Sequence, residues 1–281
     1  MADYLHLKTF EGSSAALYAT AEGDVVVVKQ SRDVESKVFH DVELAGGHPN
    51  ILHLLDLKTK SDGTSYMTLE YCENGDFLDL LNAGPIGDTQ CLTYFAQIVS
   101  AVAFLHGLGY SHTDLSFENV LLGPRREAKL MDFGYCKRLD HLLRGRSGKE
   151  PFMAPEMFTG RNWAPGPTDV WALGMMLFTL FTREYMFPDG VTAAYDLSNS
   201  LRSMGIRGVL ARNPEWQSRI PPACVRLLDV MLVFNPARRI SIDRLLKRIE
   251  TPTEPSQKRR SMTSSQFASK RKSREAPMVH S

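Results

Sequence analysis

Apolar residues in the first seventy positions gather in short runs bounded by turn residues, which is typical of strands. Residues 25–28 form a continuous β-branched run that ends at Lys29. Between 33 and 45, apolar positions recur at helical spacing until the Gly-Gly-His-Pro sequence at 46–49 ends the pattern. The pattern predicts strands at 25–29, 51–57 and 66–70 and a helix at 33–45.

Beyond residue 76 the apolar spacing becomes mostly helical. Two short apolar runs, 120–122 and 129–131, interrupt it and predict a small hairpin. The longest apolar stretch, 170–181, is much shorter than the roughly 20 residues of a membrane span, so it predicts a buried core helix. The predicted helices are 77–81, 89–108, 169–181, 193–204, 224–234 and 241–249.

Composition and charge separate the chain into a body and a tail. The chain has 281 residues, of which 43% are hydrophobic and 23% charged, so a collagen-like or fully disordered chain is excluded. Seven Lys and Arg stand against two Glu in residues 251–281, a net charge of +5 that leaves −4 for residues 1–250. Because this tail is also rich in Pro, Ser and Thr, we expect it to be disordered.

The same features predict the cellular setting. The four cysteines lie far apart, without a C-x-x-C pair, which indicates reduced thiols. No signal peptide is apparent at the N-terminus. We expect a cytoplasmic protein without a membrane span, with entry to the nucleus through the basic clusters at 258–259 and 270–272. Because the overall charge is only +1, nucleic acid is not expected as a partner of this chain, except weakly through the basic tail.

The candidate catalytic and metal-binding residues begin in the segment that starts at His112. Asp114 and Asn119 lie five residues apart, directly before the first run of the predicted hairpin. Asp132, in the sequence Asp-Phe-Gly, follows the second run. A carboxylate that can accept a proton, combined with Asn and Asp oxygens suited to Mg²⁺, fits phosphoryl transfer.

These residues resemble the motifs of the eukaryotic protein kinase family, from about residue 10 to 249. The matching segments, in family order, are 26–29 for V-A-I-K, 112–119 for the catalytic loop, 132–134 for D-F-G, 154–156 for A-P-E, 169–174 for D-V-W-S-L-G and 235–239 for N-P-x-x-R. The resemblance implies that Lys29 binds the α/β-phosphates of ATP and that Asp114 orients the acceptor hydroxyl and takes its proton. Asn119 and Asp132 would hold Mg²⁺.

The resemblance also implies the nucleotide pocket and part of the scaffold. The implied nucleotide-binding residues are Gly12 in the phosphate-covering loop, Leu17, Val27 and Leu121 around adenine, Leu69 as gatekeeper, Glu70 and Cys72 in the hinge and Asp76 at the ribose, together with Lys29, Glu35 and Asp132. Glu156 and Arg239 would form a buried structural ion pair, and Asp169 would brace the catalytic loop.

The helix carboxylate that pairs with Lys29 has two candidates. Glu35 lies one turn before Phe39 on the apolar face, as the family's glutamate does. Glu43 is the competitor, and it has no such packing neighbour. Glu35 is favoured.

Two departures from the family pattern concern phosphate binding. The loop at 10–17 retains only the middle glycine, Gly12, which leaves fewer positions where the backbone can approach phosphate closely. Thr113 replaces the arginine of H-R-D, so the usual partner of an activation-loop phosphate is absent. Low nucleotide affinity and little switching by phosphorylation are expected.

A third departure concerns the catalytic cation. Ser116 occupies the position of the lysine found in Ser/Thr kinases, and Lys149 occupies that of a threonine near A-P-E. One hypothesis is that Lys149 reaches Ser116 and Asp114 and so restores a catalytic cation near the transferred phosphate. The alternative is a solvated surface lysine.

The resemblance implies an α+β fold with two lobes in residues 1–250: a small β-rich N-lobe to about residue 70, a hinge at 70–75 and a larger helical C-lobe at 76–250. The implied activity is transfer of the γ-phosphoryl group of Mg-ATP to Ser/Thr hydroxyls of protein substrates, in the calcium/calmodulin-dependent-kinase-like branch. The main alternative is a pseudokinase scaffold, favoured by the loss of loop glycines. A small-molecule kinase on the same fold is a second alternative.

Overall fold

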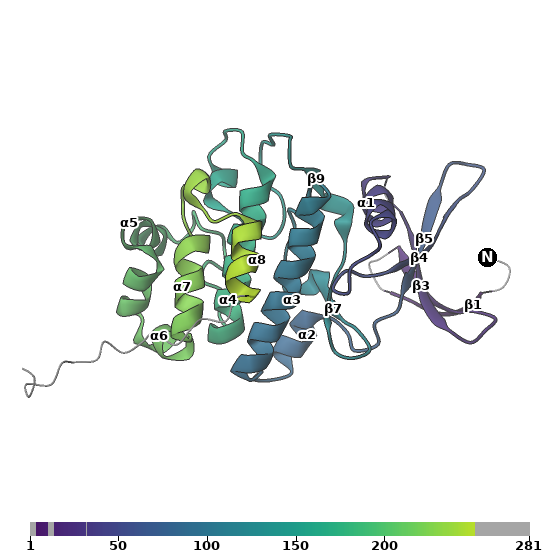
Figure 1. Ribbon diagram of the computed structural model, residues 1–281, viewed down its shortest axis with the longest axis horizontal. Helices are drawn as coiled ribbons and strands as arrows, with labels where there is room; N and C mark the ends of the chain where they lie inside the picture. The colour runs from purple at the N-terminus through teal and green to yellow at the C-terminus, as the bar shows by residue number, and fades with distance from the viewer. Residues whose placement is uncertain (1–3, 11–13, 32, 251–281) are drawn as a thin grey trace, which may run out of the picture.

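A computed structural model describes residues 4–10, 14–31 and 33–250. The expected tail at 251–281 and the predicted phosphate-loop residue Gly12 lie outside the described residues. Figure 1 shows a strand-rich lobe at one end and a helical lobe at the other, which confirms the predicted two-lobed α+β fold. Within the described part of the chain, no helix is long and apolar enough to cross a membrane.

The N-lobe is one antiparallel sheet with a helix beside it. Its strand order is β1-β2-β3-β5-β4. The elements are β1 Leu5–Thr9, β2 Ala15–Ala19, β3 Val25–Gln30, α1 Asp33–Leu44, β4 Leu54–Thr59 and β5 Ser65–Glu70. The predicted strand at 51–57 begins only at Leu54, because Ile51 forms an isolated bridge with Leu130 of the other lobe. Val38, Phe39 and Val42 are the buried apolar residues of α1, as its helical spacing predicts.

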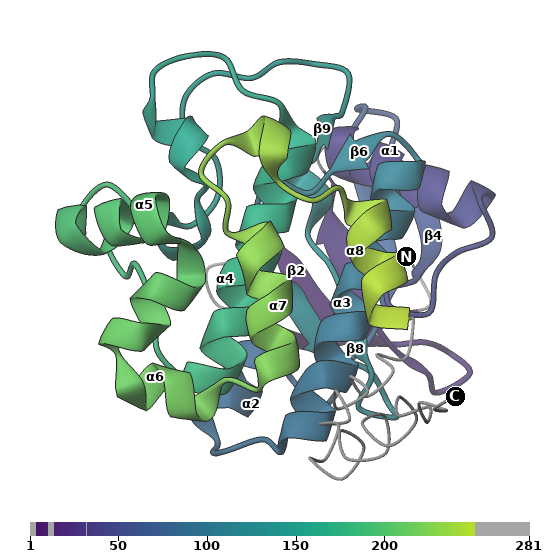
Figure 2. The ribbon, with the colours of Figure 1, turned by 60° about the vertical axis from the view of Figure 1, so that its left-hand side comes forward.

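The C-lobe is built mainly from helices around a buried central helix. Its helices are α2 Phe77–Asn82, α3 Asp88–Gly107, α4 Pro165–Thr182, α5 Tyr195–Arg212, α6 Pro214–Arg219, α7 Pro222–Met231 and α8 Ile242–Glu250. In α4, sixteen of the residues are buried, so the apolar run at 170–181 is the predicted core helix. Helix α3 packs against α4 and α8, and Figure 2 shows α8 beside α3.

Short strands and single-turn helices connect the long helices and position the polar residues. The hairpin of β7 Val120–Leu122 and β8 Ala128–Leu130 lies where the sequence predicts it, and β6 Tyr110–Ser111 pairs with β9 Lys137–Arg138. The 3₁₀ turns are Phe117–Asn119, Phe133–Tyr135, Glu150–Phe152, Pro155–Phe158 and Pro236–Arg238. The catalytic-loop segment therefore runs between β6 and β7.

The expected ion pair of Glu156 and Arg239 joins the turn at Pro155–Phe158 to the segment that precedes α8. Both nitrogens of the Arg239 fork donate to Glu156, at 2.7 and 2.9 Å. Arg239 also donates to the carbonyl oxygens of Pro167 and Val233 and lies over the Trp171 ring. Because the arginine side chain is fully buried, these bonds are needed to offset its lost hydration.

Candidate active site

Lys29 is held by a carboxylate of the neighbouring helix. It lies on β3, and its Nζ donates to Glu35 Oε1 of α1 at 2.7 Å. The Glu35 side chain is only 2% exposed, so its charge depends on this contact. The competing Glu43 instead bonds the His53 ring and the backbone N–H of Leu54. Glu35 is thus the partner of Lys29 in this structure.

Asp169 of α4 holds the start of the catalytic loop in place through hydrogen bonds. This fully buried carboxylate accepts hydrogen bonds from His106 Nε2, Ser111 Oγ and the backbone N–H groups of His112 and Thr113, at 2.7–2.9 Å. Burial alone would raise the pKa of Asp169, but the hydrogen bonds from His106 and Ser111 outweigh it and lower the pKa below its ordinary value. An ionised Asp169 therefore sets the path of the loop before Asp114.

Asp114 is a largely buried carboxylate whose two oxygens differ. Asn119 Nδ2 donates to the Asp114 carbonyl at 2.7 Å and to Oδ2 at 3.2 Å. Oδ1 has no hydrogen-bond partner among the described residues. Burial raises the pKa of Asp114 above its usual value, although His112, Asn119 and Lys149 oppose the shift. Oδ1 can therefore accept a proton from an incoming hydroxyl.

Asp132 follows β8 along the chain and lies beside Lys29. Its Oδ1 is 3.8 Å from Lys29 Nζ, and the residue adopts a left-handed conformation with φ of 60°. The next residue, Phe133, is fully buried and packs against Phe39 of α1 and His112 of the catalytic loop, with ring centroids 4.7 and 5.8 Å apart. Phe133 thereby couples the helix that carries Glu35 to the loop that carries Asp114.

Three of the residues expected around adenine, Leu17, Val27 and Leu69, share one face of the N-lobe sheet. The register pairs Leu17 with Val27 and Val27 with Leu69, so these side chains form a row across β2, β3 and β5. Leu121 on β7 forms an isolated bridge with Asp76. Leu17, Val27 and Leu69 therefore lie on neighbouring strands, and Leu121 lies beside Asp76, the residue that caps α2.

The polar hinge residues have further contacts that the sequence did not indicate. Asp76 caps α2 by accepting from the backbone N–H of Asp79 at 2.8 Å. Glu70 Oε1 accepts from Lys129 Nζ at 2.8 Å and from the His53 N–H. Cys72 is buried, and burial raises the pKa of its thiol to about 12.

Lys149 does not make the contacts that the catalytic-cation hypothesis gave it. Its Nζ binds Glu118 Oε1 at 2.7 Å, and no hydrogen bond joins it to Ser116 or Asp114 in the described part of the chain. Burial would raise the pKa of Glu118, but the hydrogen bond and the charge of Lys149 help to bring this pKa below its ordinary value. Lys149 still acts on Asp114 through space by favouring its ionised form.

Thr113 and Ser147 form a contact that sequence reasoning missed. Thr113 has φ of 58°, rare for a β-branched residue, and its hydroxyl donates to the carbonyl of Tyr135 at 2.6 Å. Ser147 Oγ then donates to Thr113 Oγ1 at 3.2 Å. A β-carbon on the adjacent Gly148 would lie 2.9 Å from the Thr113 carbonyl oxygen. The segment after Asp-Phe-Gly is therefore held against the catalytic loop through hydroxyl groups.

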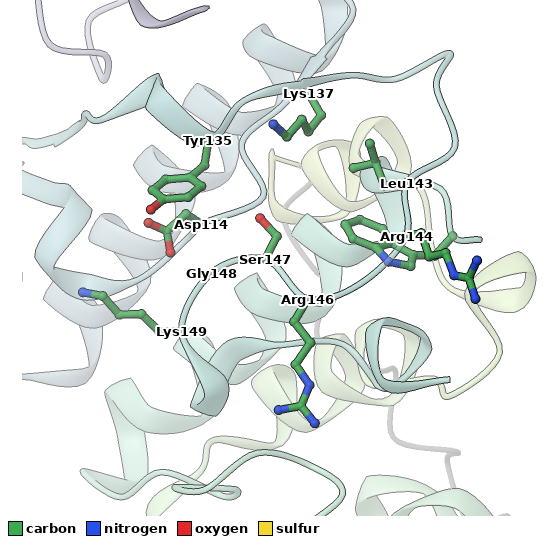
Figure 3. Close-up of a pocket in the computed structure, with 10 residues that line it drawn as sticks. Asp114, Tyr135, Lys137, Leu143, Arg144, Arg146, Ser147, Gly148 and Lys149 are labelled. Carbon is green, nitrogen blue, oxygen red and sulfur yellow. The ribbon is translucent and has the colours of Figure 1, made fainter. Parts of the chain in front are cut away.

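A cavity of about 590 Å³ opens beside Asp114 at this contact. Figure 3 shows Asp114 and Tyr135 on one side of it, with Lys137, Ser147 and Arg146 following along the segment. The sequence offered no local signal for this cavity, because its lining comes from the catalytic loop and the segment after it.

Comparison with known proteins places this geometry in context. The family model for the protein kinase domain matches residues 12–249. The chain is 32% identical over 203 residues to serine/threonine-protein kinase kin-29 of Caenorhabditis elegans, which covers 71% of this chain and 23% of that protein. It is 34% identical over 186 residues to the maternal embryonic leucine zipper kinase of Xenopus tropicalis, covering 64% and 27%. The chain thus spans about a quarter of the length of these relatives.

Proposed function

The chain belongs to the protein kinase family, and from this premise we propose that it transfers the γ-phosphoryl group of Mg-ATP to Ser/Thr hydroxyls of protein substrates. One observation carries the proposal: Lys29, Glu35 and Asp132 form one group of charged side chains, and Asn119, which is bonded to Asp114, accepts at its carbonyl from the N–H of Met131, the residue before Asp132. Lys29 is within 4 Å of both Glu35 and Asp132, and Asn119 is bonded to Asp114. Phosphoryl transfer needs this combination of cation, metal-holding oxygens and proton acceptor.

The residues present fit Mg-ATP. Asn119 Nδ2 is used by Asp114, which leaves the amide oxygen as the atom that can ligate a cation. No cluster of three or more acidic, His or Cys side chains that could hold a metal occurs among the described residues. One carboxylate and one amide oxygen suit Mg²⁺ that is also held by phosphate oxygens. Bound Mg-ATP would supply the phosphoryl group and the metal charge.

The chain's own side chains then position and deprotonate the acceptor. Glu35 holds the Lys29 ammonium in a fixed position, from which it would neutralise phosphate charge when ATP is bound. Asp114 Oδ1 receives the proton of the Ser or Thr hydroxyl, and its raised pKa makes it a better proton acceptor than an exposed aspartate. Asn119 holds Asp114 Oδ2, so only Oδ1 turns to the substrate.

Transfer of radiolabelled phosphate from ATP and Mg²⁺ to generic protein acceptors tests the proposal. Wild-type protein should transfer label to Ser and Thr residues of the acceptor proteins, which phosphoamino-acid analysis identifies. The Asp132→Asn variant should transfer no label. Absence of label with wild-type protein, together with nucleotide-independent binding of partners, would instead support the scaffold alternative.

We also propose that the protein acts in the cytoplasm and enters the nucleus through the basic clusters of the tail. Their spacing in the sequence supports this. Replacing Lys270, Arg271 and Lys272 with Ala in a fluorescent fusion should reduce nuclear signal; an unchanged distribution would contradict the proposal.

A further inference from the structure

The cavity beside Asp114 is strongly basic. Four of its lining side chains are cationic, namely Lys137, Arg144, Arg146 and Lys149, whereas Asp114 is its single carboxylate. Figure 3 shows the Lys137 ammonium turned toward the side of Asp114 and Tyr135, with the two arginines farther along the segment. We call this cavity the activation-segment pocket. A water-filled hollow of one charge sign concentrates ions of the opposite sign.

Lys137 is the cation of this pocket that is best placed to bind an anionic ligand. It lies on β9, where pairing with Ser111 of β6 fixes its backbone next to the catalytic loop. The residue is half-buried, yet within the described part of the chain its ammonium has no hydrogen bond or ion pair. Lysine in such a position gains from an anion that enters the pocket.

The two arginines of this segment, Arg144 and Arg146, keep donors for a ligand, although the Arg146 guanidinium also lies over the Phe158 ring at 4.6 Å. Arg146 pairs with Glu150 four residues on, but both side chains are at least half exposed, and such pairs contribute little. Arg144 uses only its Nε, which donates to the Gly160 carbonyl. The terminal nitrogens of Arg144 therefore remain available to a charged ligand.

An acidic group of the catalytic loop, Glu118, is already engaged by a cation of the chain. Glu118 follows Asp114 in the catalytic loop and is bound by Lys149. The groups near Asp114 thus disfavour a cationic neighbour of the acceptor hydroxyl and favour an anionic one.

We propose that the activation-segment pocket binds an anionic side chain of the substrate, carboxylate or phosphate, close to the acceptor Ser or Thr. This inference rests on the proposed kinase activity, and it makes Lys137, Arg144 and Arg146 specificity-determining residues. The anion enters between Lys137 and the two arginines while the acceptor hydroxyl lies at Asp114.

Peptides that differ only in flanking charge test the proposal on the full chain. Each peptide has one serine, flanked by Glu, Gln, Lys or phosphoserine, the last phosphorylated in advance. We expect kcat/KM for the Glu peptide to exceed that for the Gln peptide by about tenfold, mainly through KM. The ratio should fall as salt is raised, because surface charges are screened. A further gain with phosphoserine assigns phosphate as the preferred anion, and no gain assigns carboxylate.

Variants connect the preference to the pocket. Lys137→Gln and the exposed double variant Arg144→Gln/Arg146→Gln should each lower the Glu-to-Gln ratio several-fold. Arg244→Gln, an exposed arginine on α8, is the matched control and should keep the ratio. Because Lys137 is half-buried, its variant is checked by thermal unfolding, and the double variant gives an answer even if Lys137→Gln unfolds.

Several results would overturn the proposal. One is a Glu-to-Gln ratio within twofold of one, and another is a preference that survives in both pocket variants. A phosphate on Ser147 in the purified protein, detected by mass spectrometry and combined with no acidic preference, would assign the pocket to the chain's own segment. If no peptide is labelled, the proposed function fails instead, and fluorescence anisotropy of the Glu and Gln peptides still decides whether the pocket selects anions.

Discussion

Asparagine in place of Asp169 isolates the bracing of the catalytic loop. In the structure, Oδ2 accepts from His106, Ser111 and the N–H of His112, and Oδ1 accepts from the N–H of Thr113. If the amide oxygen takes the place of Oδ2, the amide nitrogen faces the Thr113 N–H, and two donors meet. The substitution therefore changes one atom and leaves a buried donor without an acceptor.

The cost follows from these contacts. One buried unsatisfied donor costs about 1–3 kcal/mol. The three remaining hydrogen bonds then go to a neutral acceptor instead of a charged one. For one or two of these bonds, the weakening costs roughly a further 1 kcal/mol each. We expect a loss of about 4 kcal/mol in the free energy of unfolding, which for a domain of this size lowers Tm by about 8–16 °C.

The pH dependence adds a second signature. Because the native pKa of Asp169 is lowered, its contribution to stability is present above the unfolded pKa and is lost as pH falls through the native one. The stability difference between wild type and Asp169→Asn should therefore be largest near neutral pH and shrink on acidification.

Urea unfolding followed by circular dichroism measures both effects, and kcat measures the displacement of the loop. Asp189→Asn, at an exposed carboxylate, is the matched control and should change stability by at most about 0.5 kcal/mol. A loss below about 1 kcal/mol in Asp169→Asn, or a difference that does not shrink with acid, would show that an ionised Asp169 does not hold the catalytic loop.

Three other predictions follow from the same contacts. Lys29→Met removes the ammonium that pairs with buried Glu35, so phosphate transfer should be lost and urea unfolding should show a stability decrease of about 1–3 kcal/mol; normal transfer would contradict this role. Arg239→Met leaves the Glu156 carboxylate without its bidentate partner and should lower the free energy of unfolding by about 3–5 kcal/mol. A measured loss below about 1 kcal/mol would contradict this prediction. The acid limb of kcat/KM should lie above the ordinary pKa of aspartate, because Asp114 must be ionised, and Lys149→Met should move it to higher pH; a downward move in the pH–rate profile would be inconsistent with the electrostatic role of Lys149.

Helical spacing and short β-branched runs predicted the elements that bury an apolar face. Helix α1 and strand β3 were found this way because Phe39 and Val26 enter the core. Strand β1 was missed because its residues are exposed, including Leu5 at 68%, so no burial pattern marks it. Helix α6 has six residues and no buried one. Helix α5 continues past its predicted end at residue 204, because Gly205 with φ of 66° forms a kink rather than a terminus.

At the site, the sequence indicated residues but not all of their partners. Asp114, Asn119 and Asp132 stand in recognisable local motifs, so their identity needed no tertiary information. The bond between Thr113 and Ser147 joins residues 34 positions apart, and that of Lys149 with Glu118 likewise crosses between loops. Such contacts depend on how the segment after Asp-Phe-Gly folds back. No periodicity or motif reports that path.

The most direct test of the account compares nucleotide binding with phosphate transfer in Asp114→Asn. Asp114 acts on the acceptor hydroxyl, whereas Lys29 and Asp132 act on the nucleotide. The variant should therefore bind Mg-ATP with a Kd within about threefold of wild type, while kcat falls at least about 100-fold. Wild-type kcat in Asp114→Asn would contradict the central claim that this carboxylate is the proton acceptor.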